Sequence, residues 1–420
     1  MTPKWSELLD ETIDRRFETM VDIRRHLHTH PELSGDERQT SLFLYQLLGD
    51  EDLDVRMGPD GCGVIVDSGN DTEVATAQRI ALRADIDALQ IHDTKEVTYR
   101  SQCDGVMHAC GHDAHTAIVF GATAALQELA NTNCLPWPVP LRSVFQPAEE
   151  ICTGAKSMID VGVLDGVAGI LSIHMDPSRK VGKIGWRTGV LTANCDEMHV
   201  TITGRGGHAA RPHEASDPIA AAAQLINALY LFIPRATDSQ DAVVVTVGQV
   251  VGGEMANVIP EQVKLRGTVR TLDRTVRTNT FDHIYRLAQG IGKTTETEIK
   301  VHWGVAAPSV VNDEQMTSLL RCAAREVLGE NGLEEIERPS MGSEDFAFYL
   351  DEVPGAMIRI GCASSQLGNA ALHSTLFDID EESIRIAAKI LARSAVRWAD
   401  PQGPHKHKHK KINTDLGAGI

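Results

Sequence analysis

Met107-His108-Ala109-Cys110-Gly111-His112-Asp113-Ala114-His115 brings three imidazoles, a thiol and a carboxylate into one short segment around a single glycine. Cys110 and His112 are two residues apart, so both side chains point to the same side of an extended segment. A thiolate and an imidazole together suit zinc, with cobalt, nickel or manganese as alternatives. Packing alone would need a buried cysteine and several capping histidines, which explains this density less well. The segment therefore predicts one part of a metal site.

A helix is predicted directly after this segment, over residues 114–126, because the residues there are mostly apolar. Asp113 stands where that helix would begin, and its carboxylate either caps the helix or orients a ligating imidazole. One short segment supplies too few ligands for a metal site. The remaining ligands must therefore come from other parts of the chain.

The length and composition of the chain are those of a globular protein with two domains. Its 420 residues are too many for one simple core, and 42% of them are hydrophobic. A net charge of −18 argues against a nucleic-acid partner and against an anionic membrane surface. The N-terminus is charged, and no apolar run is expected to approach membrane-spanning length. Eight cysteines without paired spacing indicate free thiols. We therefore expect a cytoplasmic protein.

Helices and strands alternate through the first part of the chain, which predicts an α/β fold. Two aspartates, Asp85 and Asp87, follow a predicted strand, where α/β folds keep their chemistry. A turn built from aspartates is the alternative interpretation. The predicted helices cover 5–27, 37–48 and 154–161, and the predicted strands cover 63–67, 79–83, 141–146 and 169–173.

Two adjacent carboxylates, Glu149 and Glu150, follow the strand over 141–146. They would repel each other if buried, unless a positive charge such as a metal ion lay beside them. One could then ligate the metal while the other handles protons, as metal-assisted hydrolysis requires. Two later histidines complete the set, one at the tip of the strand over 169–173 and one near the C-terminus. The five predicted ligands, enough for two metal ions, are Cys110, His112, one of the two glutamates, His174 and His373.

A different pattern separates residues 190–305 from the α/β segments on either side. The order strand, helix, strand, strand, helix, strand is the split unit that forms a four-stranded antiparallel sheet with two helices. These elements cover 196–203, 215–233, 242–250, 262–269, 274–291 and 296–303. We therefore predict an α/β domain in two parts, an inserted α+β domain of ferredoxin-like topology and a disordered tail. Their bounds are 1–189 and 306–400 for the α/β domain, 190–305 for the inserted domain and 401–420 for the tail.

Four motifs in the chain resemble those of an enzyme family. They are His108-Ala109-Cys110-Gly111-His112-Asp113-Ala114-His115, Pro147-Ala148-Glu149-Glu150, Gly206-Gly207-His208-Ala209-Ala210 with Pro212-His213, and Gly342-Ser343-Glu344-Asp345-Phe346. The family is that of the dinuclear metal-dependent amidohydrolases of the aminoacylase and carboxypeptidase type. It includes hippurate hydrolase and the indoleacetyl-amino-acid hydrolases of plants. The resemblance covers about residues 26–398.

The resemblance implies a metallopeptidase-like catalytic domain, with a mixed sheet flanked by helices, and an inserted lid and dimerisation domain. It implies two divalent metal ions per subunit, zinc or else manganese, cobalt or nickel. Glu149 would be the general base. The implied metal ligands are Cys110, His112, Glu150, His174 and His373.

Further roles follow from the same resemblance. His208 would meet the substrate carbonyl, from the partner subunit of a homodimer. Asn257 and Arg270 are candidates for binding a substrate carboxylate. Apart from the resemblance, we expect Asp87 and Asp113 to support the metal ligands from behind.

The reaction that the resemblance implies is hydrolysis of the amide bond of an N-acyl amino acid or a related small amide. Two metal ions would activate a water, Glu149 would move its proton and His208 would stabilise the oxyanion. Alternatives are a dipeptidase or carboxypeptidase, an N-acetyl-diaminopimelate-type deacetylase, and a catalytically silent metal-binding scaffold. A silent scaffold would have no reason to keep a second carboxylate beside a ligand, so Glu149 argues against it.

Two departures from the family pattern concern the substrate range. Gln90 stands where the family usually has proline, and Ile151 and Cys152 follow the glutamates where glycines are usual. Cys152 is either a further soft ligand or a packed side chain. Because the second departure borders the implied catalytic carboxylates, we expect it to change which substrate fits and not which reaction occurs.

Overall fold

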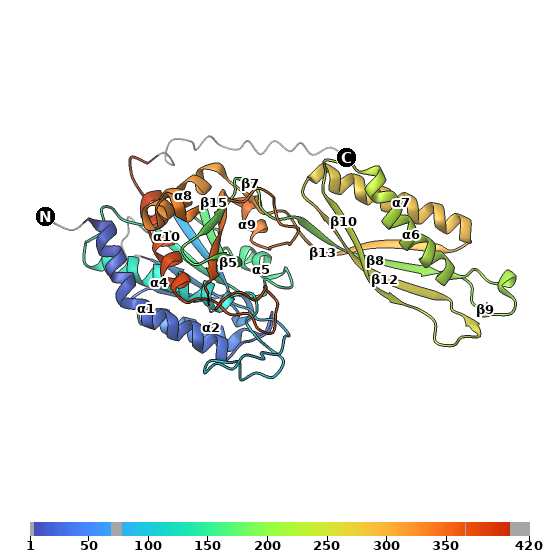
Figure 1. Cartoon of the computed structure of the whole chain (residues 1–420), viewed down its shortest axis with the longest axis horizontal. Coiled ribbons are helices and arrows are strands. Elements are labelled where there is room, and N and C mark those ends of the chain that lie inside the picture. The colour runs from blue at the N-terminus through green and yellow to red at the C-terminus, as the bar shows by residue number, and fades with distance from the viewer. Residues whose placement is uncertain (1–3, 69–77, 366, 404–420) are drawn as a thin grey trace.

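The computed structural model describes residues 4–68, 78–365 and 367–403, which form the two bodies seen in Figure 1. One body holds a large mixed sheet with helices, and the other holds a small antiparallel sheet with two helices. The predicted α/β fold with an additional α+β part is thereby confirmed. The predicted tail lies outside the described residues from 404 onward.

An eight-stranded sheet forms the centre of the first body, in the order β1-β2-β4-β3-β5-β16-β6-β15. Its four middle strands, β4, β3, β5 and β16, are parallel to one another, so their carboxyl ends lie at one edge of the sheet. The strands are β1 Asp54–Met57, β2 Val64–Asp67, β3 Arg79–Asp85, β4 Leu141–Gln146, β5 Val167–Lys180, β6 Ile184–Trp186, β15 Leu333–Glu335 and β16 Gly355–Ala363.

Helices cover both faces of this sheet. The side chains of β3 alternate between two hydrophobic cores, one on each face. Ile80 and Leu82 belong to the core of four helices that contact one another, α1, α4, α8 and α10. Ala81 points to the opposite face and belongs to the core that contains residues of α5 and α9. The helices are α1 Trp5–Thr29, α2 Arg38–Gly49, α4 His112–Asn131, α5 Gly154–Asp160, α8 Glu314–Leu328, α9 Ala347–Glu352 and α10 Glu382–Trp398.

The second body is built from the segment that the sequence sets apart. Its sheet has the order β10-β12-β8-β13, with every neighbouring pair antiparallel. Val200 of the sheet is buried together with Leu225 and Ile284 of the two helices. The elements are β8 Asn194–Thr203, α6 Pro218–Ala236, β10 Val243–Val251, β12 Gln262–Thr271, α7 Arg274–Thr295 and β13 Glu298–Ala307, with the short pairs β7 Gly189–Val190 with β14 Val311–Asn312 and β9 Gly207–His208 with β11 Val258–Ile259.

The predicted elements differ from the observed ones mainly at their ends. β5 continues to Lys180 because β16 pairs with it beyond residue 173, so His174 lies inside the strand and not at its tip. α6 begins at Pro218 because the side chain of Asp217 accepts a hydrogen bond from the backbone N–H of Ile219 at 2.8 Å. The short strands β1, β6 and β15 were not predicted, since three or four residues are too few to show a period.

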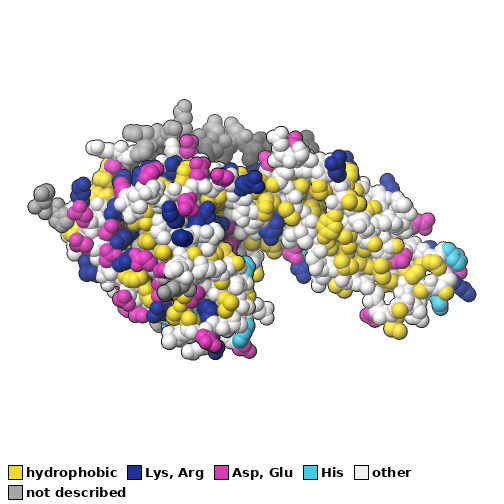
Figure 2. Space-filling view, viewed as in Figure 1, with side chains coloured by type: hydrophobic (Ala, Val, Ile, Leu, Met, Phe, Trp, Pro, Cys, Tyr) yellow, Lys and Arg dark blue, Asp and Glu magenta, His cyan; other side chains and the backbone are white. Residues whose placement is uncertain are grey.

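One described helix, α6, is long and apolar enough to cross a membrane by length and composition alone. The expectation that no segment would meet this criterion is therefore wrong. The helix packs Leu225 and Leu229 into the core of the second body, whereas Leu231 and Phe232 are exposed. Figure 2 shows hydrophobic side chains gathered on the surface of the second body.

Candidate metal centre

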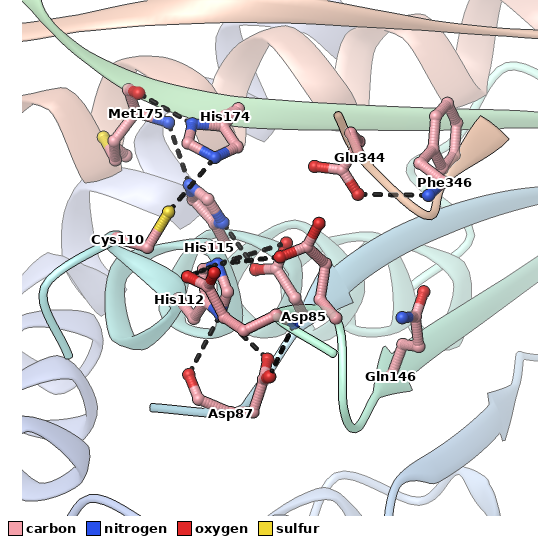
Figure 3. A network of polar contacts seen from close by, with 12 residues as sticks. Asp85, Asp87, Cys110, His112, His115, Gln146, His174, Met175, Glu344 and Phe346 are labelled. Carbon is pink, nitrogen blue, oxygen red and sulfur yellow. Dashed lines mark hydrogen bonds and ion pairs between the residues drawn. The ribbon is translucent and has the colours of Figure 1, made fainter. Parts of the chain in front are cut away.

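The five predicted ligands come together at the carboxyl ends of the parallel strands. Cys110 precedes α4, Glu150 follows β4, His174 lies in β5 and His373 lies in the loop after β16. One group of three consists of Cys110, His112 and His174, whose ligand atoms all lie within 4.8 Å of one another. A second group of three consists of Cys110, Glu150 and His373, within the same distance. Figure 3 shows that Cys110 and His174 point toward one another.

The distances inside this cluster are those of groups that face a common centre. The Cys110 Sγ lies 3.5 Å from the Nε2 of His174, and the His373 Nε2 lies 3.3 Å from the Oε1 of Glu150. The same Glu150 oxygen lies 3.9 Å from the Nε2 of His112. Cys110 and Glu150 thus connect three imidazoles that come from different parts of the chain.

Two buried atoms of the cluster have no hydrogen-bond partner among the described residues, the Nε2 of His112 and the Oε1 of Glu150. A buried polar atom without a partner costs free energy. Such atoms therefore indicate where a bound ligand would supply the partner. Sulfur, nitrogen and oxygen donors in one cluster suit a divalent transition metal. The residues present therefore fit metal ions, and two groups of three that share Cys110 fit two of them.

The electrostatics of the cluster favour positive charge. Burial would lower the pKa of His112, but Asp85 and Cys110 raise it well above its ordinary value. Interactions with Cys110 and with Glu150 raise the pKa of His373 to about 10. A centre that draws protons onto imidazoles in this way is one that also attracts metal cations.

Asp87 lies directly behind His112. The Nδ1 of His112 is 3.0 Å from the Oδ1 of Asp87 and 2.9 Å from its backbone oxygen, which leaves the Nε2 turned to the cluster. Burial would raise the pKa of Asp87, and the hydrogen bond from His112 lowers it. A carboxylate that fixes the ring in this way has the contact that an orienting residue needs.

Asp113 lies elsewhere. Its side chain contacts Arg24 at 2.9 Å and the Nδ1 of His28 at 2.7 Å, and its other oxygen accepts the backbone N–H of Ala114. None of its described hydrogen bonds reaches a predicted ligand. The observed contacts therefore do not include the one expected if Asp113 oriented a ligating imidazole, because its side chain contacts Arg24 and His28 of α1 instead.

The imidazole of His115 also lies behind the cluster, and sequence reasoning assigned it no role. The Nδ1 of His115 lies 2.6 Å from the Oδ1 of Asp85, and its Nε2 accepts the backbone N–H of Met175 at 2.8 Å. His115 therefore ties the start of α4 to β3 and to β5, next to His174 (Figure 3).

The backbone at the site takes conformations that few side chains allow. Gly111 has φ of +90°, and a Cβ there would lie 2.9 Å from the Cγ of Met175, so only glycine fits between Cys110 and His112. Ala148, Cys152 and His373 have φ of 53°, 54° and 62°, although none of them is glycine. Such strained residues cluster at functional sites, where the surrounding structure holds them in place.

Glu37 supports the strained turn before the two glutamates. Its Oε1 accepts the backbone N–H of Ala148 at 2.8 Å, and its Oε2 is buried without a hydrogen-bond partner among the described residues. Burial raises the pKa of Glu37 from 4.5 to about 7. The stability that this group contributes is therefore fully present below pH 4.5 and is lost as the pH rises through about 7.

Replacing this group should remove that pH dependence. We expect the free energy of unfolding of Glu37→Gln, relative to the unchanged protein, to rise by about 3 kcal/mol between pH 4.5 and pH 8. Urea denaturation of both proteins at the two pH values measures the difference. An identical pH dependence in both proteins would show that Glu37 is not the titrating group.

Glu149 lies on the other side of the cluster, with its Oε2 4.0 Å from the Nε2 of His112. Burial first, and then Glu344, Asp345 and Glu150, raise its pKa well above the ordinary value. Side-chain oxygens of Glu149, Glu344 and Asp345 all lie within 4.8 Å of one another. A carboxyl group with a raised pKa beside candidate metal ligands is suited to accept and return a proton.

Glu344 and Asp345 come from the motif over residues 342–346, to which sequence reasoning assigned no role. Arg83 joins them to the site, since its fully buried guanidinium contacts Asp85 at 2.6 Å and Glu344 and Asp345 at 2.9 Å each. Sequence reasoning also missed Arg83. The signal was its place inside an apolar strand, because a buried arginine requires partners.

A cavity of about 490 Å³ opens onto this cluster, a volume that suits a small molecule. Arg270 lines it together with Cys152, Glu344 and Arg359, and so do four of the five predicted ligands. The Arg270 Nη1 donates to the backbone oxygen of Met341 at 2.8 Å. A larger cavity of about 600 Å³, between Trp5, Trp137 and Arg397, contains none of the predicted ligands.

His208 and Asn257 are not part of this cavity. Both are exposed. The backbone N–H of Ala209 donates to the backbone oxygen of Asn257 at 3.1 Å, so His208 and Asn257 lie close together. His208 belongs to β9, which Figure 1 places at the end of the second body far from the large sheet. Within one chain, the structure therefore separates His208 and Asn257 from the candidate metal centre and brings only Arg270 to it.

The chain belongs to peptidase family M20/M25/M40, whose sequence model matches residues 81–397. The family model includes the segments that carry the predicted ligands and the inserted second body. The prediction of a metal-dependent amidohydrolase with this fold is thereby confirmed.

Similar proteins include N-acetyl-L-cysteine deacetylase of Bacillus subtilis, which is 39% identical over 91% of this chain and 88% of its own length. IAA-amino acid hydrolase ILR1-like 2 of Arabidopsis thaliana is 34% identical over 91% of this chain and 85% of its own length. Among solved structures, the B. subtilis YXEP protein, described as a dinuclear metal binding peptidase, superposes with a TM-score of 0.75. It is 33% identical and covers 91% of this chain and 98% of its own.

Proposed function

We propose that this enzyme hydrolyses the amide bond of N-acyl amino acids and releases a carboxylate and a free amino acid. The observation that carries the proposal is the cavity of about 490 Å³, which is lined both by four of the five candidate metal ligands and by Arg270. A guanidinium and a metal cluster in the same cavity suit a substrate with a carboxylate at one end and an amide at the other. The similarity to deacetylases and hydrolases of N-acylated amino acids supports the same class of substrate.

The proposed metal ligands are Cys110, His112, Glu150, His174 and His373. Two divalent ions bound there would lower the pKa of a water and polarise the scissile carbonyl. Zinc suits the mixed sulfur and nitrogen donors best, with manganese, cobalt or nickel as alternatives.

Glu149 acts as the general base in this proposal. It accepts a proton from the attacking water and passes it to the departing nitrogen. Glu149 lies beside the proposed ligands but is not one of the five, and this position supports the role of general base. Asp87 keeps the ring of His112 in place during these steps.

We assign residues 190–305 to a lid and dimerisation domain, inserted between catalytic parts at 1–189 and 306–400. The exposed apolar side chains of α6 and β10 support a homodimer, because soluble monomers rarely expose such a surface. β10 also stands at the edge of its sheet, where a second copy could add strands. The exposed apolar residues are Ile219, Tyr230, Leu231, Phe232, Val244, Val250 and Val251.

A homodimer would also explain the distance of His208 and Asn257 from the cluster. From the partner subunit, His208 would donate to the developing oxyanion and Asn257 would help Arg270 to bind the substrate carboxylate. Domain closure would bring these groups to the site. All eight cysteines are free, which supports a location in the cytoplasm.

Subunit exchange tests the shared site. Glu149→Gln and His208→Ala should each be nearly inactive alone. An equal mixture of the two should recover about a quarter of the activity of the unchanged enzyme. About half of the dimers would then be mixed, and each mixed dimer carries one complete site of two. Exchange proved by mass-tagged subunits, without recovered activity, would place the action of His208 within its own chain.

The proposed function is tested with a panel of N-acetyl, N-benzoyl and longer N-acyl amino acids, together with dipeptides. Protein stripped of metal is reloaded with zinc, manganese, cobalt or nickel, and the released amino acid is measured. We expect turnover of N-acyl amino acids to exceed that of dipeptides. Turnover of dipeptides alone would make the enzyme a dipeptidase instead.

A further inference from the structure

Glu344 presents one free carboxylate oxygen to the cavity. The residue is 2% exposed, and its Oε1 accepts from Arg83 at 2.9 Å and from the backbone N–H of Phe346 at 3.1 Å. Its Oε2 accepts none of the hydrogen bonds found among the described residues. Glu344 lines the cavity, and Figure 3 shows its second oxygen pointing toward the cluster of candidate ligands.

The neighbouring carboxylate, Asp345, is used differently. Its Oδ1 accepts from Arg83 and from Gln146, and its Oδ2 accepts from Gln146 and from the backbone N–H of Ala155. Both oxygens are therefore occupied, and Asp345 does not line the cavity. Two adjacent carboxylates thus bind the same arginine, but only Glu344 keeps a free acceptor for a ligand.

The carboxylates around Arg83, which include that of Glu344, outnumber its single positive charge. The single guanidinium of Arg83 contacts three carboxylates, those of Asp85, Glu344 and Asp345. Glu149 adds a fourth carboxyl group within 4.8 Å of Glu344 and Asp345. A buried carboxylate oxygen in such a place favours a ligand group with N–H donors and positive charge.

The proposed reaction creates such a group beside Glu149. The carbon–nitrogen bond of the amide breaks, the water oxygen joins the acyl carbon, and both water protons end on the nitrogen. An amide N–H thereby becomes an ammonium group on the released amino acid. Because Glu149 handles the protons, this nitrogen must come close to Glu149 and hence to the carboxylate of Glu344, one oxygen of which lies within 4.8 Å of a Glu149 oxygen.

We propose that Glu344 binds the nitrogen end of the substrate: it accepts the N–H of the scissile amide and, after cleavage, holds the ammonium of the amino-acid product. Arg270 holds the carboxylate of the same molecule, so the two residues together recognise an α-amino acid. This inference rests on the proposed function and adds to it a residue that selects for a nitrogen bearing hydrogen.

Product inhibition by two matched compounds tests the inference. L-Leucine and 4-methylpentanoate differ only in the amino group, and each is measured as an inhibitor of the hydrolysis of an N-acyl-L-leucine. In the unchanged holoenzyme we expect L-leucine to bind at least about tenfold more tightly, the effect of one charge-assisted hydrogen bond. Glu344→Gln should bring the two inhibition constants to within about twofold of each other by weakening L-leucine.

Asp345→Asn is the matched control, since it removes a carboxylate from the same arginine without touching the cavity. It should lower thermal stability but preserve the preference for L-leucine. If Glu344→Gln retains the tenfold preference, the inference is overturned while the proposed function stands. If Glu344→Gln does not fold, equal binding of the two compounds by the unchanged enzyme overturns it. An enzyme that cleaves no N-acyl amino acid overturns the proposed function, and the inference with it.

Discussion

Glu149→Gln should lower kcat by about 10² to 10⁴ while the protein keeps its metal. Glutamine keeps the size and polarity of the side chain but cannot accept a proton from water. The structure gives Glu149 a position beside the candidate ligands, 4.0 Å from His112, next to the buried carboxylates Glu344 and Asp345. Metal content after dialysis and kcat on the best N-acyl substrate are measured together.

Glu150→Gln is the matched comparison, because the two glutamates are adjacent and are changed in the same way. The Oε1 of Glu150 lies 3.3 Å from His373 and 3.9 Å from His112, so losing its charge should lower metal content as well as activity. The reverse result, with metal lost from Glu149→Gln and kept by Glu150→Gln, would exchange the two roles.

Much of the fold could be predicted because its signals are local. The period of two in β8 and the apolar period of α1 are visible in single segments. The order of elements alone predicted the antiparallel sheet of the second body, since β-α-β-β-α-β units pair in one way. The strand ends were less certain because they depend on pairing partners, as β5 shows.

The candidate ligands could be proposed for a related reason. Cys110 and His112 stand in one short segment rich in possible ligands. Glu150 follows β4, at the edge of the sheet where the parallel strands have their carboxyl ends. The contacts of Glu344 could not be proposed, since its partner Arg83 lies 261 positions earlier in the chain. Composition and spacing carry no information on contacts of that length.

The place of His208 shows a different limit of local reasoning. Its glycine-rich motif marks it as unusual, but nothing in the segment says which site it serves. Within one chain it lies at the end of the second body, far from the large sheet (Figure 1). Only closure of the two bodies or a second chain can join it to the metal centre, and the sequence of a single chain describes neither.

Cys110→Ala should remove most of the bound metal and most of the activity, because Cys110 is the one residue shared by the two groups of three candidate ligands described above. Alanine offers no donor atom, so both ions would lose a ligand at once. We expect a loss of metal affinity greater than the 10- to 100-fold that is typical of changes behind the ligands. Metal content after dialysis and activity at saturating zinc measure the two effects.

Cys362→Ala is the matched control. Cys362 is a fully buried cysteine of β16 that belongs to none of the candidate ligand groups. Its replacement loses a similar amount of packing, and it should therefore cost stability without a change in metal content. If Cys110→Ala keeps its full metal content and turnover, the thiol is a packed side chain and the centre must be built from the imidazoles and carboxylates alone. A loss of metal in Cys110→Ala but not in Cys362→Ala separates ligation from packing, because both variants remove a buried sulfur and only one removes a donor.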